Sequence, residues 1–202
     1  MCALRLRHSI FLIGCNYVQL RQLAVQTMRL FVALQIPGQV QEALVTLRQD
    51  MPGLRWANNV HLTLRFIGQV TDAQAQEVEQ ALKRVVFAPF VLRLNALGMF
   101  ARHSSIVWAG LEDSFQLHDL KKQVDSALLD AIGLAPENRY SPHITLARMK
   151  SKPNAQLKAF VEQHARLPEL SFRVERFVLF SSQLKPDGAV HMPAAVYSCR
   201  KN

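Results

Sequence analysis

One four-residue pattern occurs twice in this chain. HLTL at 61–64 and HITL at 143–146 both read His-apolar-Thr-Leu, and they lie 82 positions apart (143 − 61). Polar and apolar residues alternate in both, which is typical of a strand with one buried face. The fold must therefore hold two such strands by their apolar faces. Each strand then presents a histidine and a threonine on its other face.

The flanking segments predict helices and strands in two similar rounds. Turn residues and apolar periodicity place the boundaries, with Gly68 closing a strand, Thr71 as a helix N-cap and Gly133 as a helix C-cap. Strands are expected at 29–36, 59–68, 90–100, 104–111, 143–149, 170–184 and 189–199, and helices at 39–51, 71–87, 114–133 and 154–166.

The order of these elements predicts an α+β fold. The hairpins expected at 90–111 and 170–199 favour mostly antiparallel pairing. Because each round holds one copy of the pattern, we expect two lobes related by a pseudo-twofold axis. Each lobe would have its own mostly antiparallel sheet with helices packed outside.

The composition suits a basic globular protein. Of the 202 residues 50% are hydrophobic, the formal net charge is +9, and the charges are scattered rather than gathered in a tail. Such a surface is typical of proteins that meet polyanions such as nucleic acid. The three cysteines form no C-x-x-C pair, which favours a reducing compartment. We expect a cytoplasmic monomer without a membrane partner.

Residues 1–27 differ from the remainder. They contain arginines but no acidic residue, and the apolar run at 9–15 is too short to span a bilayer. A lipoprotein-type signal ending at Cys15 is one interpretation. The favoured one is an upstream start codon with Met28 as the natural beginning. We therefore expect an extension at 1–27 and a single domain at 28–202.

Two imidazoles facing each other suit phosphodiester chemistry. One neutral imidazole can take a proton from water while a protonated one gives a proton to the leaving oxygen, since the usual histidine pKa is about 6.5. The candidates are His61 and His143, with the hydroxyls of Thr63 and Thr145 as donors to the phosphate oxygens. Neither histidine lies beside a carboxylate or cysteine cluster, so neither a metal ion nor another cofactor is expected.

Four segments extend this pattern into a family likeness: RLFVALQIP, NNVHLTLRFIG, SSIVWAGL and SPHITLAR, in that order. With them the chain resembles the two-histidine (2H) phosphoesterase superfamily over about 28–199. It is most similar to the RNA 2′,3′-cyclic phosphodiesterases, long called 2′-5′ RNA ligases. The resemblance implies a bilobal fold with the active-site cleft between two sheets, and metal-independent hydrolysis of an RNA or nucleoside 2′,3′-cyclic phosphate to a 2′-phosphate. It also implies His61 as general acid, His143 as general base, and Arg148 as an added phosphate ligand.

Strand alternation gives a different result for the arginines. It puts Arg65 on the His61 face, as a rival phosphate ligand, and puts Arg148 on the face opposite His143 unless the strand twists, bulges or ends there. Three aromatic residues could stack on a base. Tyr140, in the loop before the second pattern, is favoured, whereas Phe66 and Trp108 are expected in the core.

Two other functions remain open at this point. The positive charge would also suit an RNA-binding module without catalysis. The same two histidines would serve an enzyme whose substrate is a small nucleotide such as ADP-ribose cyclic phosphate rather than an RNA end. Joining of RNA through a 2′-5′ bond is the reverse of opening the cyclic phosphate, so the residues permit both directions.

Overall fold

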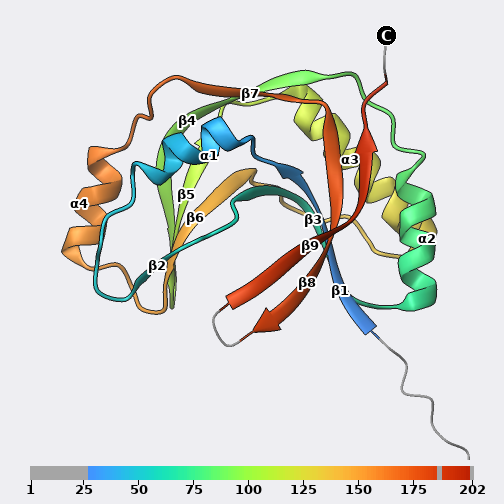
Figure 1. Cartoon of the computed structure of the whole chain (residues 1–202), viewed down its shortest axis with the longest axis horizontal. Helices are drawn as coiled ribbons and strands as arrows, with labels where there is room; N and C mark the ends of the chain where they lie inside the picture. Colours follow the sequence, from blue (N-terminus) through green and yellow to red (C-terminus); the bar gives the residue numbers. More distant parts are fainter. Residues whose placement is uncertain (1–26, 186–187, 201–202) are drawn as a thin grey trace, which may run out of the picture.

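A computed structural model describes residues 27–185 and 188–200. The predicted extension at 1–27 lies outside the described residues, apart from Thr27. The α+β class is confirmed, because helices pack against a sheet whose neighbouring strands are all antiparallel (Figure 1). The helices are α1 (Gly38–Val45), α2 (Asp72–Leu82), α3 (Phe115–Ile132) and α4 (Ala155–Gln163). The strands are β1 (Thr27–Gln35), β2 (Leu54–Trp56), β3 (His61–Thr71), β4 (Phe90–Ala101), β5 (Ser105–Leu111), β6 (His143–Met149), β7 (Leu170–Val174), β8 (Arg176–Lys185) and β9 (Gly188–Ser198).

The two predicted sheets are one sheet. The strand order is β7-β4-β5-β6-β3-β1-β8-β9, and β2 pairs with β6 beside this path. The two halves join where β3 meets β6, and the only registered pair between these strands is Leu62 with Ile144. The prediction of separate sheets was wrong because the two pattern strands are hydrogen-bonded neighbours. The sheet is strongly curled, so its halves still face in different directions (Figure 1).

The halves are not consecutive in sequence either. Strands β8 and β9, at the end of the chain, pair with β1, and α3 follows β5 in sequence but packs against β3. Helices α2 and α3 cover one half of the sheet, whereas α4 packs on β4 and α1 touches β7 (Figure 1). The two halves of the sheet therefore do not correspond to two consecutive rounds of the sequence, as the prediction of two lobes required.

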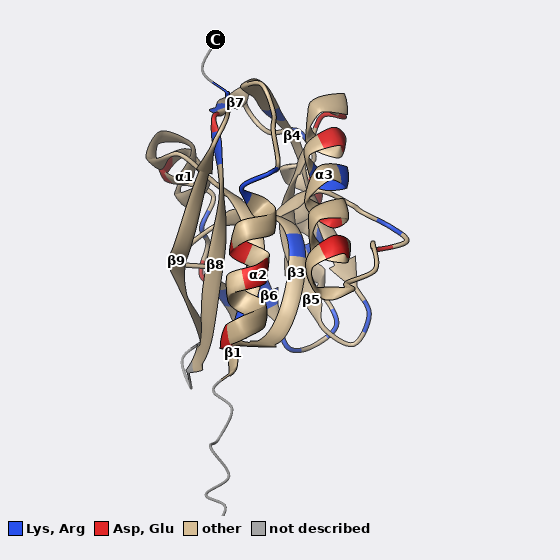
Figure 2. Cartoon of the chain, turned by 90° about the vertical axis from the view of Figure 1, so that its right-hand side faces the viewer, with Lys and Arg blue, Asp and Glu red and all other residues tan. Residues whose placement is uncertain are grey.

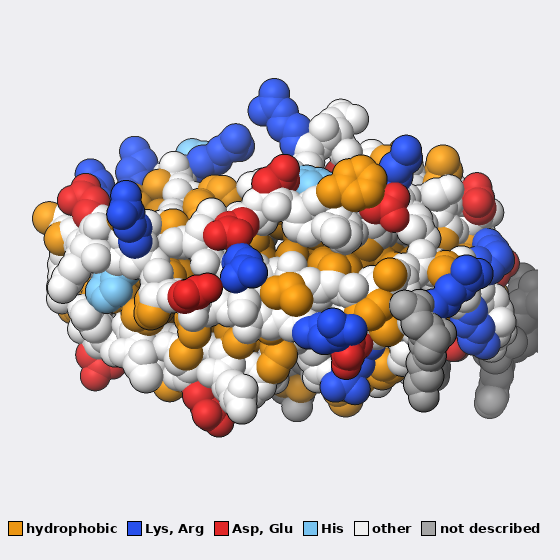
Figure 3. Space-filling view, turned by 90° about the horizontal axis from the view of Figure 1, so that it is seen from above, with side chains coloured by type: hydrophobic (Ala, Val, Ile, Leu, Met, Phe, Trp, Pro, Cys, Tyr) orange, Lys and Arg blue, Asp and Glu red, His pale blue; other side chains and the backbone are white. Residues whose placement is uncertain are grey.

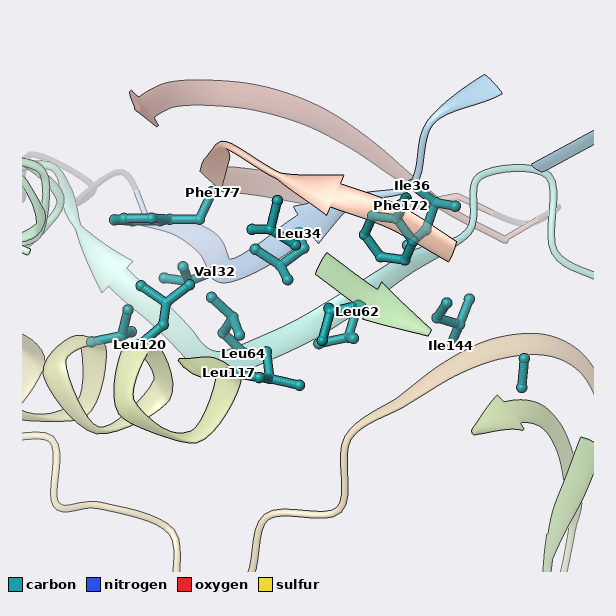
Figure 4. Close-up of a cluster of buried hydrophobic side chains, with 14 of the residues drawn as sticks. Val32, Leu34, Ile36, Leu62, Leu64, Leu117, Leu120, Ile144, Phe172 and Phe177 are labelled. Carbon is teal, nitrogen blue, oxygen red and sulfur yellow. The ribbon is translucent and has the colours of Figure 1, made fainter. Parts of the chain in front are cut away.

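The apolar faces of the two pattern strands lie in the main core. Leu62, Leu64 and Ile144 are almost completely buried there, with α3 contributing Leu117 and Leu120 (Figure 4). Complete burial of one such side chain stabilises the fold by about 1.5–3 kcal/mol. Both strands are therefore held firmly by their apolar faces, which leaves the opposite face for polar residues.

The predicted caps are confirmed. The Thr71 side chain accepts from the Gln74 backbone N–H, and the Gln74 side chain accepts from the Thr71 backbone N–H, which together form a capping box. Gly133 ends α3 with a left-handed backbone at φ 68°. Both signals are local in sequence, which is why single residues predicted them.

Several predicted boundaries were wrong, among them the end of the helix predicted at 71–87, which ends at Leu82. Strand β3 continues past Gly68, where a register shift and a φ of 94° mark a bulge that glycine permits. The predicted strand at 170–184 is two strands, since β7 pairs with β4 and β8 with β1. The first helix ends at Val45, six residues before the predicted end at 51, and the short strand β2 that follows was not predicted.

Charge is unevenly distributed over the fold. Acidic residues lie along α2 and α3 (Figure 2), namely Asp72, Glu77, Glu79, Asp119, Asp125 and Asp130. Seen from above, basic and acidic side chains are interspersed (Figure 3). The excess positive charge is thus not a uniform coat. Within the described ranges, no helix is long and apolar enough to cross a membrane.

Candidate active site

The two histidine patterns lie next to each other in the sheet. Strands β3 and β6 are antiparallel, with Leu62 opposite Ile144. This register puts His61 across from the position of Thr145 and His143 across from that of Thr63. All four polar side chains share the face away from the buried leucines. The structure therefore brings the two predicted histidine–threonine pairs together.

Both imidazoles are oriented by the same type of contact. The Nδ1 atom of His61 lies 3.3 Å from the carbonyl oxygen of Asn59, and the Nδ1 atom of His143 lies 2.8 Å from that of Ser141. A carbonyl oxygen can only accept, so Nδ1 is the protonated donor in both rings. Nε2 is then the nitrogen free to accept or donate a proton in each histidine.

A bulge occurs at the same point of both pattern strands. The pairing of β1 with β3 skips Leu64, and the pairing of β5 with β6 skips Leu146. An extra residue in one strand reverses the side-chain alternation after it. Arg148 is therefore exposed on the His143 face, and its positive charge lowers the pKa of His61. Strict alternation had placed Arg148 on the opposite face.

The same bulge turns Arg65 away from His61. Its side chain is only 5% exposed and lies 3.7 Å from Asp125 and 3.5 Å from Glu137. It also donates to the Ala135 carbonyl. The prediction that Arg65 shares the His61 face was wrong, because alternation breaks at Leu64. Arg65 instead ties β3 to α3 and to the segment before β6.

Phe66 occupies the position in β3 that Arg148 occupies in β6. It is 56% exposed, and its ring centroid lies 5.9 Å from that of Phe31, which is itself 5.0 Å from the His61 ring. The expectation that Phe66 is core was wrong, because the bulge points it outward. An exposed ring beside a candidate catalytic histidine is placed where a base could stack.

Trp108 flanks the other histidine. It lies opposite Thr145, with its ring centroid 6.4 Å from that of His143 and 5.2 Å from that of Phe100. Gly98 makes room for the indole, since a Cβ there would come within 2.1 Å of it. The side chain is half-buried on the histidine face rather than in the main core.

Tyr140 is not placed to stack on a base. Its hydroxyl donates to the Thr63 carbonyl at 3.2 Å, and the ammonium of Lys121 lies 5.1 Å from its ring. Burial, together with Glu137 and Asp125, raises the pKa of the phenol. The preference for Tyr140 as the stacking residue was wrong. It anchors the segment that leads into β6 and so positions His143.

A third histidine, which the sequence did not single out, lies in the site. The ring of His191, on β9, is 5.3 Å from that of His61 and 4.8 Å from that of Phe31, and its buried Nδ1 atom has no hydrogen-bond partner among the described residues. The ring of Phe180, on β8, also lies against those of Phe31 and His61. No local signal marks His191, because it reaches His61 through the pairing of β9 with β8 and of β8 with β1.

The environment of His61 disfavours its charged form. Burial, together with the charges of His191, Arg148 and His143, lowers its pKa to about 4, against a raising effect of the Asn59 carbonyl. In the free protein His61 is therefore neutral at neutral pH, and it stays neutral until the pH falls close to 4. Its Nε2 atom then carries a lone pair.

Replacement of His191 by phenylalanine should raise the pKa of His61. The change keeps an aromatic ring against Phe31 but removes a group whose positive charge opposes protonation of His61. Burial would still hold the pKa of His61 below 6.5. NMR titration of the His61 ring in the two proteins measures the difference. An unchanged or lower pKa would show that His191 exerts no charge effect on His61.

The groups at this site suit proton transfer rather than metal binding. In the described part of the chain, no group of three or more His, Cys, Asp or Glu residues is arranged to hold a metal ion. Two Nε2 atoms, two threonine hydroxyls and Arg148 instead surround one region of the sheet face. Such a set can move protons at both ends of a displacement at phosphorus while donors hold the phosphate oxygens.

The chain is similar to known proteins in both sequence and fold. Residues 36–186 match the model of the 2′-5′ RNA ligase superfamily. A Thermotoga maritima protein named RNA 2′,3′-cyclic phosphodiesterase is 30% identical over 86% of this chain and 95% of its own. A crystal structure from Thermus thermophilus is similar at a TM-score of 0.72 and 28% identity, over 86% of this chain and 98% of that one. Escherichia coli LigT has the same fold at a TM-score of 0.71 and 24% identity, over 87% of this chain and 99% of that one, and has been solved with ATP and with 3′-AMP.

Proposed function

The chain belongs to the 2′-5′ RNA ligase superfamily, and from this membership we propose that it opens 2′,3′-cyclic phosphates at RNA ends. The product would carry a 2′-phosphate and a free 3′-hydroxyl. The observation that carries the proposal is the pair of imidazoles, both held at Nδ1 by a backbone carbonyl two residues earlier. Two matched Nε2 atoms on one sheet face suit a reaction that needs one proton removed and one supplied.

The proposed reaction is an in-line displacement by water. The neutral His143 takes a proton from water, whose oxygen then bonds to phosphorus. The bond from phosphorus to the 3′ oxygen breaks, and the protonated His61 gives that oxygen its proton. Thr63, Thr145 and Arg148 donate to the non-bridging oxygens, where negative charge develops. The division of roles between the histidines follows the family likeness, since the two patterns are locally symmetric.

The low pKa of His61 bears on this division. An acid must be protonated in the complex, whereas His61 is neutral in the free protein at neutral pH. The cyclic phosphate carries one negative charge, and an opposite charge close to an imidazole raises its pKa. We therefore propose that His61 gains its proton as the substrate binds. That proton would come from solvent, and His143 would release to solvent the proton that it took from water.

Binding of a nucleoside 2′-phosphate should raise the pKa of His61 from about 4 toward or above its usual value. The free protein and the complex can be compared by NMR titration of the His61 ring. A pKa that stays low in the complex would reverse the assignment, with His61 as base and His143 as acid. The proposal of a two-histidine phosphodiesterase would survive that outcome.

The activity itself is tested by turnover without added metal. An oligoribonucleotide with a 2′,3′-cyclic end should be converted to the 2′-phosphate alone, and a chelator should not change the rate. Formation of a 3′-phosphate, or turnover that appears only with added metal, would contradict the mechanism. Adding RNA with a 5′-hydroxyl end to the cyclic-phosphate substrate tests 2′-5′ joining, in which that hydroxyl replaces water as the nucleophile and the 3′ oxygen again leaves.

A panel of substrates separates RNA ends from small nucleotides. ADP-ribose cyclic phosphate and nucleoside 2′,3′-cyclic phosphates offer the same cyclic phosphate without a chain. The formal charge of +9 supports the RNA end as the better substrate. A non-catalytic RNA-binding protein would bind these oligonucleotides and convert none of them.

A further inference from the structure

We propose that Arg55, directly opposite Arg148 in the sheet, forms a subsite for the RNA strand beyond its cyclic end. The inference rests on the proposed function and adds a ligand class to it, namely the backbone phosphates of the upstream nucleotides. The subsite lies where the short strand β2 pairs with β6, next to the histidine face. It would make an oligonucleotide a better substrate than a mononucleotide.

The register of β2 carries the inference. Arg55 lies directly opposite Arg148, between the pairs Leu54–Met149 and Trp56–Ala147. Directly opposed residues of an antiparallel pair have Cβ atoms about 4.5–5.5 Å apart and point to the same face. Two guanidinium groups are therefore set side by side on the sheet.

The neighbours of Arg55 show which face this is. Trp56 packs edge-on against Phe160 of α4 at 6.0 Å, and its indole N–H donates to the Gln49 carbonyl at 3.0 Å. Leu54 and Trp56 both pack against the main core. Arg55 therefore points away from the helices and is exposed, as Arg148 is. Both guanidinium groups thus share the face of His143.

Among the described residues, no carboxylate neutralises the two positive charges of this pair. Neither Arg55 nor Arg148 has a carboxylate oxygen within 4.0 Å there, although Arg65, Arg93 and Arg173 all have one. Like charges placed directly opposite each other in a sheet are destabilising. A bound polyanion would relieve that repulsion, which gives the pair a physical reason to exist.

The position of Arg148 indicates which phosphate Arg55 can reach. Its charge already acts on His61, so it lies beside the proposed reaction. Arg55 is one strand farther out, on β2. A second phosphate, rather than the one that reacts, is the group that Arg55 is placed to meet.

Other exposed basic residues lie past the same end of β6 as Arg148. Lys150 follows β6, and Arg102 is in the β4–β5 turn just before Ser105, whose hydroxyl donates to the Ser151 carbonyl at 2.9 Å. Many of the acidic residues lie elsewhere, along α2 and α3 (Figure 2). A single strand tracks positive charge of this kind through its phosphates.

The test compares Arg55→Met with Arg84→Met, a matched exposed arginine that follows α2. The substrates are an oligoribonucleotide with a 2′,3′-cyclic end and a nucleoside 2′,3′-cyclic monophosphate. For Arg55→Met the ratio of kcat/KM between oligonucleotide and mononucleotide should fall about tenfold, as expected for one charged hydrogen bond. Arg84→Met should keep the wild-type ratio. Thermal unfolding of Arg55→Met should stay at or above the wild-type midpoint.

A direct measurement of RNA binding tests the subsite independently of the proposed catalytic function. Fluorescence anisotropy with a labelled oligoribonucleotide ending in a 2′-phosphate gives the affinity at several salt concentrations. Loss of one phosphate contact should weaken binding and reduce the slope of log K against log salt by about 0.7. If the wild type binds this RNA but turns over neither substrate, the proposed function fails while the binding data still judge Arg55.

Two results would overturn the subsite. An equal loss of kcat/KM on both substrates would mean that Arg55 contacts the cyclic phosphate itself. An unchanged ratio with an unchanged salt slope would mean that Arg55 contacts no phosphate of the bound strand.

Discussion

Replacement of His61 or His143 by alanine is expected to lower kcat on a 2′,3′-cyclic RNA end by about 10²–10⁴-fold each. General acid and general base groups contribute factors of this size. Each variant loses a ring whose Nδ1 atom is held by a backbone carbonyl and whose Nε2 atom faces the same region of the sheet. The loss should appear mainly in kcat, because Thr63, Thr145 and Arg148 still hold the phosphate.

The double variant and a surface histidine complete this experiment. His61→Ala with His143→Ala should be little worse than the more damaging single change, because the two groups act in one step. His118→Ala is the matched control, since His118 is an exposed residue of α3 paired with Asp113. Both single histidine variants should still bind RNA. Full activity in either of them would refute the two-histidine mechanism.

The second large effect is expected in stability. Replacement of Asp125 by alanine should lower the free energy of unfolding by about 3–5 kcal/mol, since it removes the buried carboxylate that lies between two buried cations. Lys121 lies 2.5 Å from one Asp125 oxygen, and Arg65 lies 3.7 Å from the other. Arg65 and Asp125 attract each other by charge without a hydrogen bond between them. Among the described residues, the partly exposed Glu137 is then the only carboxylate left beside both cations. Urea or thermal unfolding measures the loss.

Two further variants locate the effect. Glu137→Gln should cost less, because the Glu137 side chain is more exposed and Asp125 remains in place. Arg65→Met should destabilise the fold yet keep the affinity for a nucleoside 2′-phosphate. Reduced phosphate affinity in a folded Arg65→Met protein would restore the role in phosphate binding that alternation predicted. An Asp125→Ala protein as stable as the wild type would show that Glu137 alone balances the cluster.

Strand alternation correctly placed the histidines and threonines of the two patterns but misplaced the residues that follow them. It put His61, Thr63, His143 and Thr145 on polar faces, and the structure has them there. It failed beyond the fourth residue of each pattern, since a bulge inserts one residue against the neighbouring strand. A bulge depends on how two distant segments pair. Neither segment shows it alone.

The aromatic residues illustrate the same limit. Phe66 and Trp108 were expected in the core and lie on the histidine face, whereas Tyr140 was expected at the substrate and packs against α3. Apolar side chains carry no local mark of which surface they cover. His191 likewise reaches His61 only through two successive strand pairings.

The sequence by itself determined the α+β class, the helix caps and the two strands that carry the histidines, because each depends on residues within one or two turns or on a period of two. Tertiary structure decided that the pattern strands are neighbours in one curled sheet, that Arg148 rather than Arg65 joins the site, and that His191 and the Arg55–Arg148 pair flank it. These outcomes follow from the register between segments far apart in the chain. Register is set by packing of the whole core, and that information is not local to any stretch of sequence.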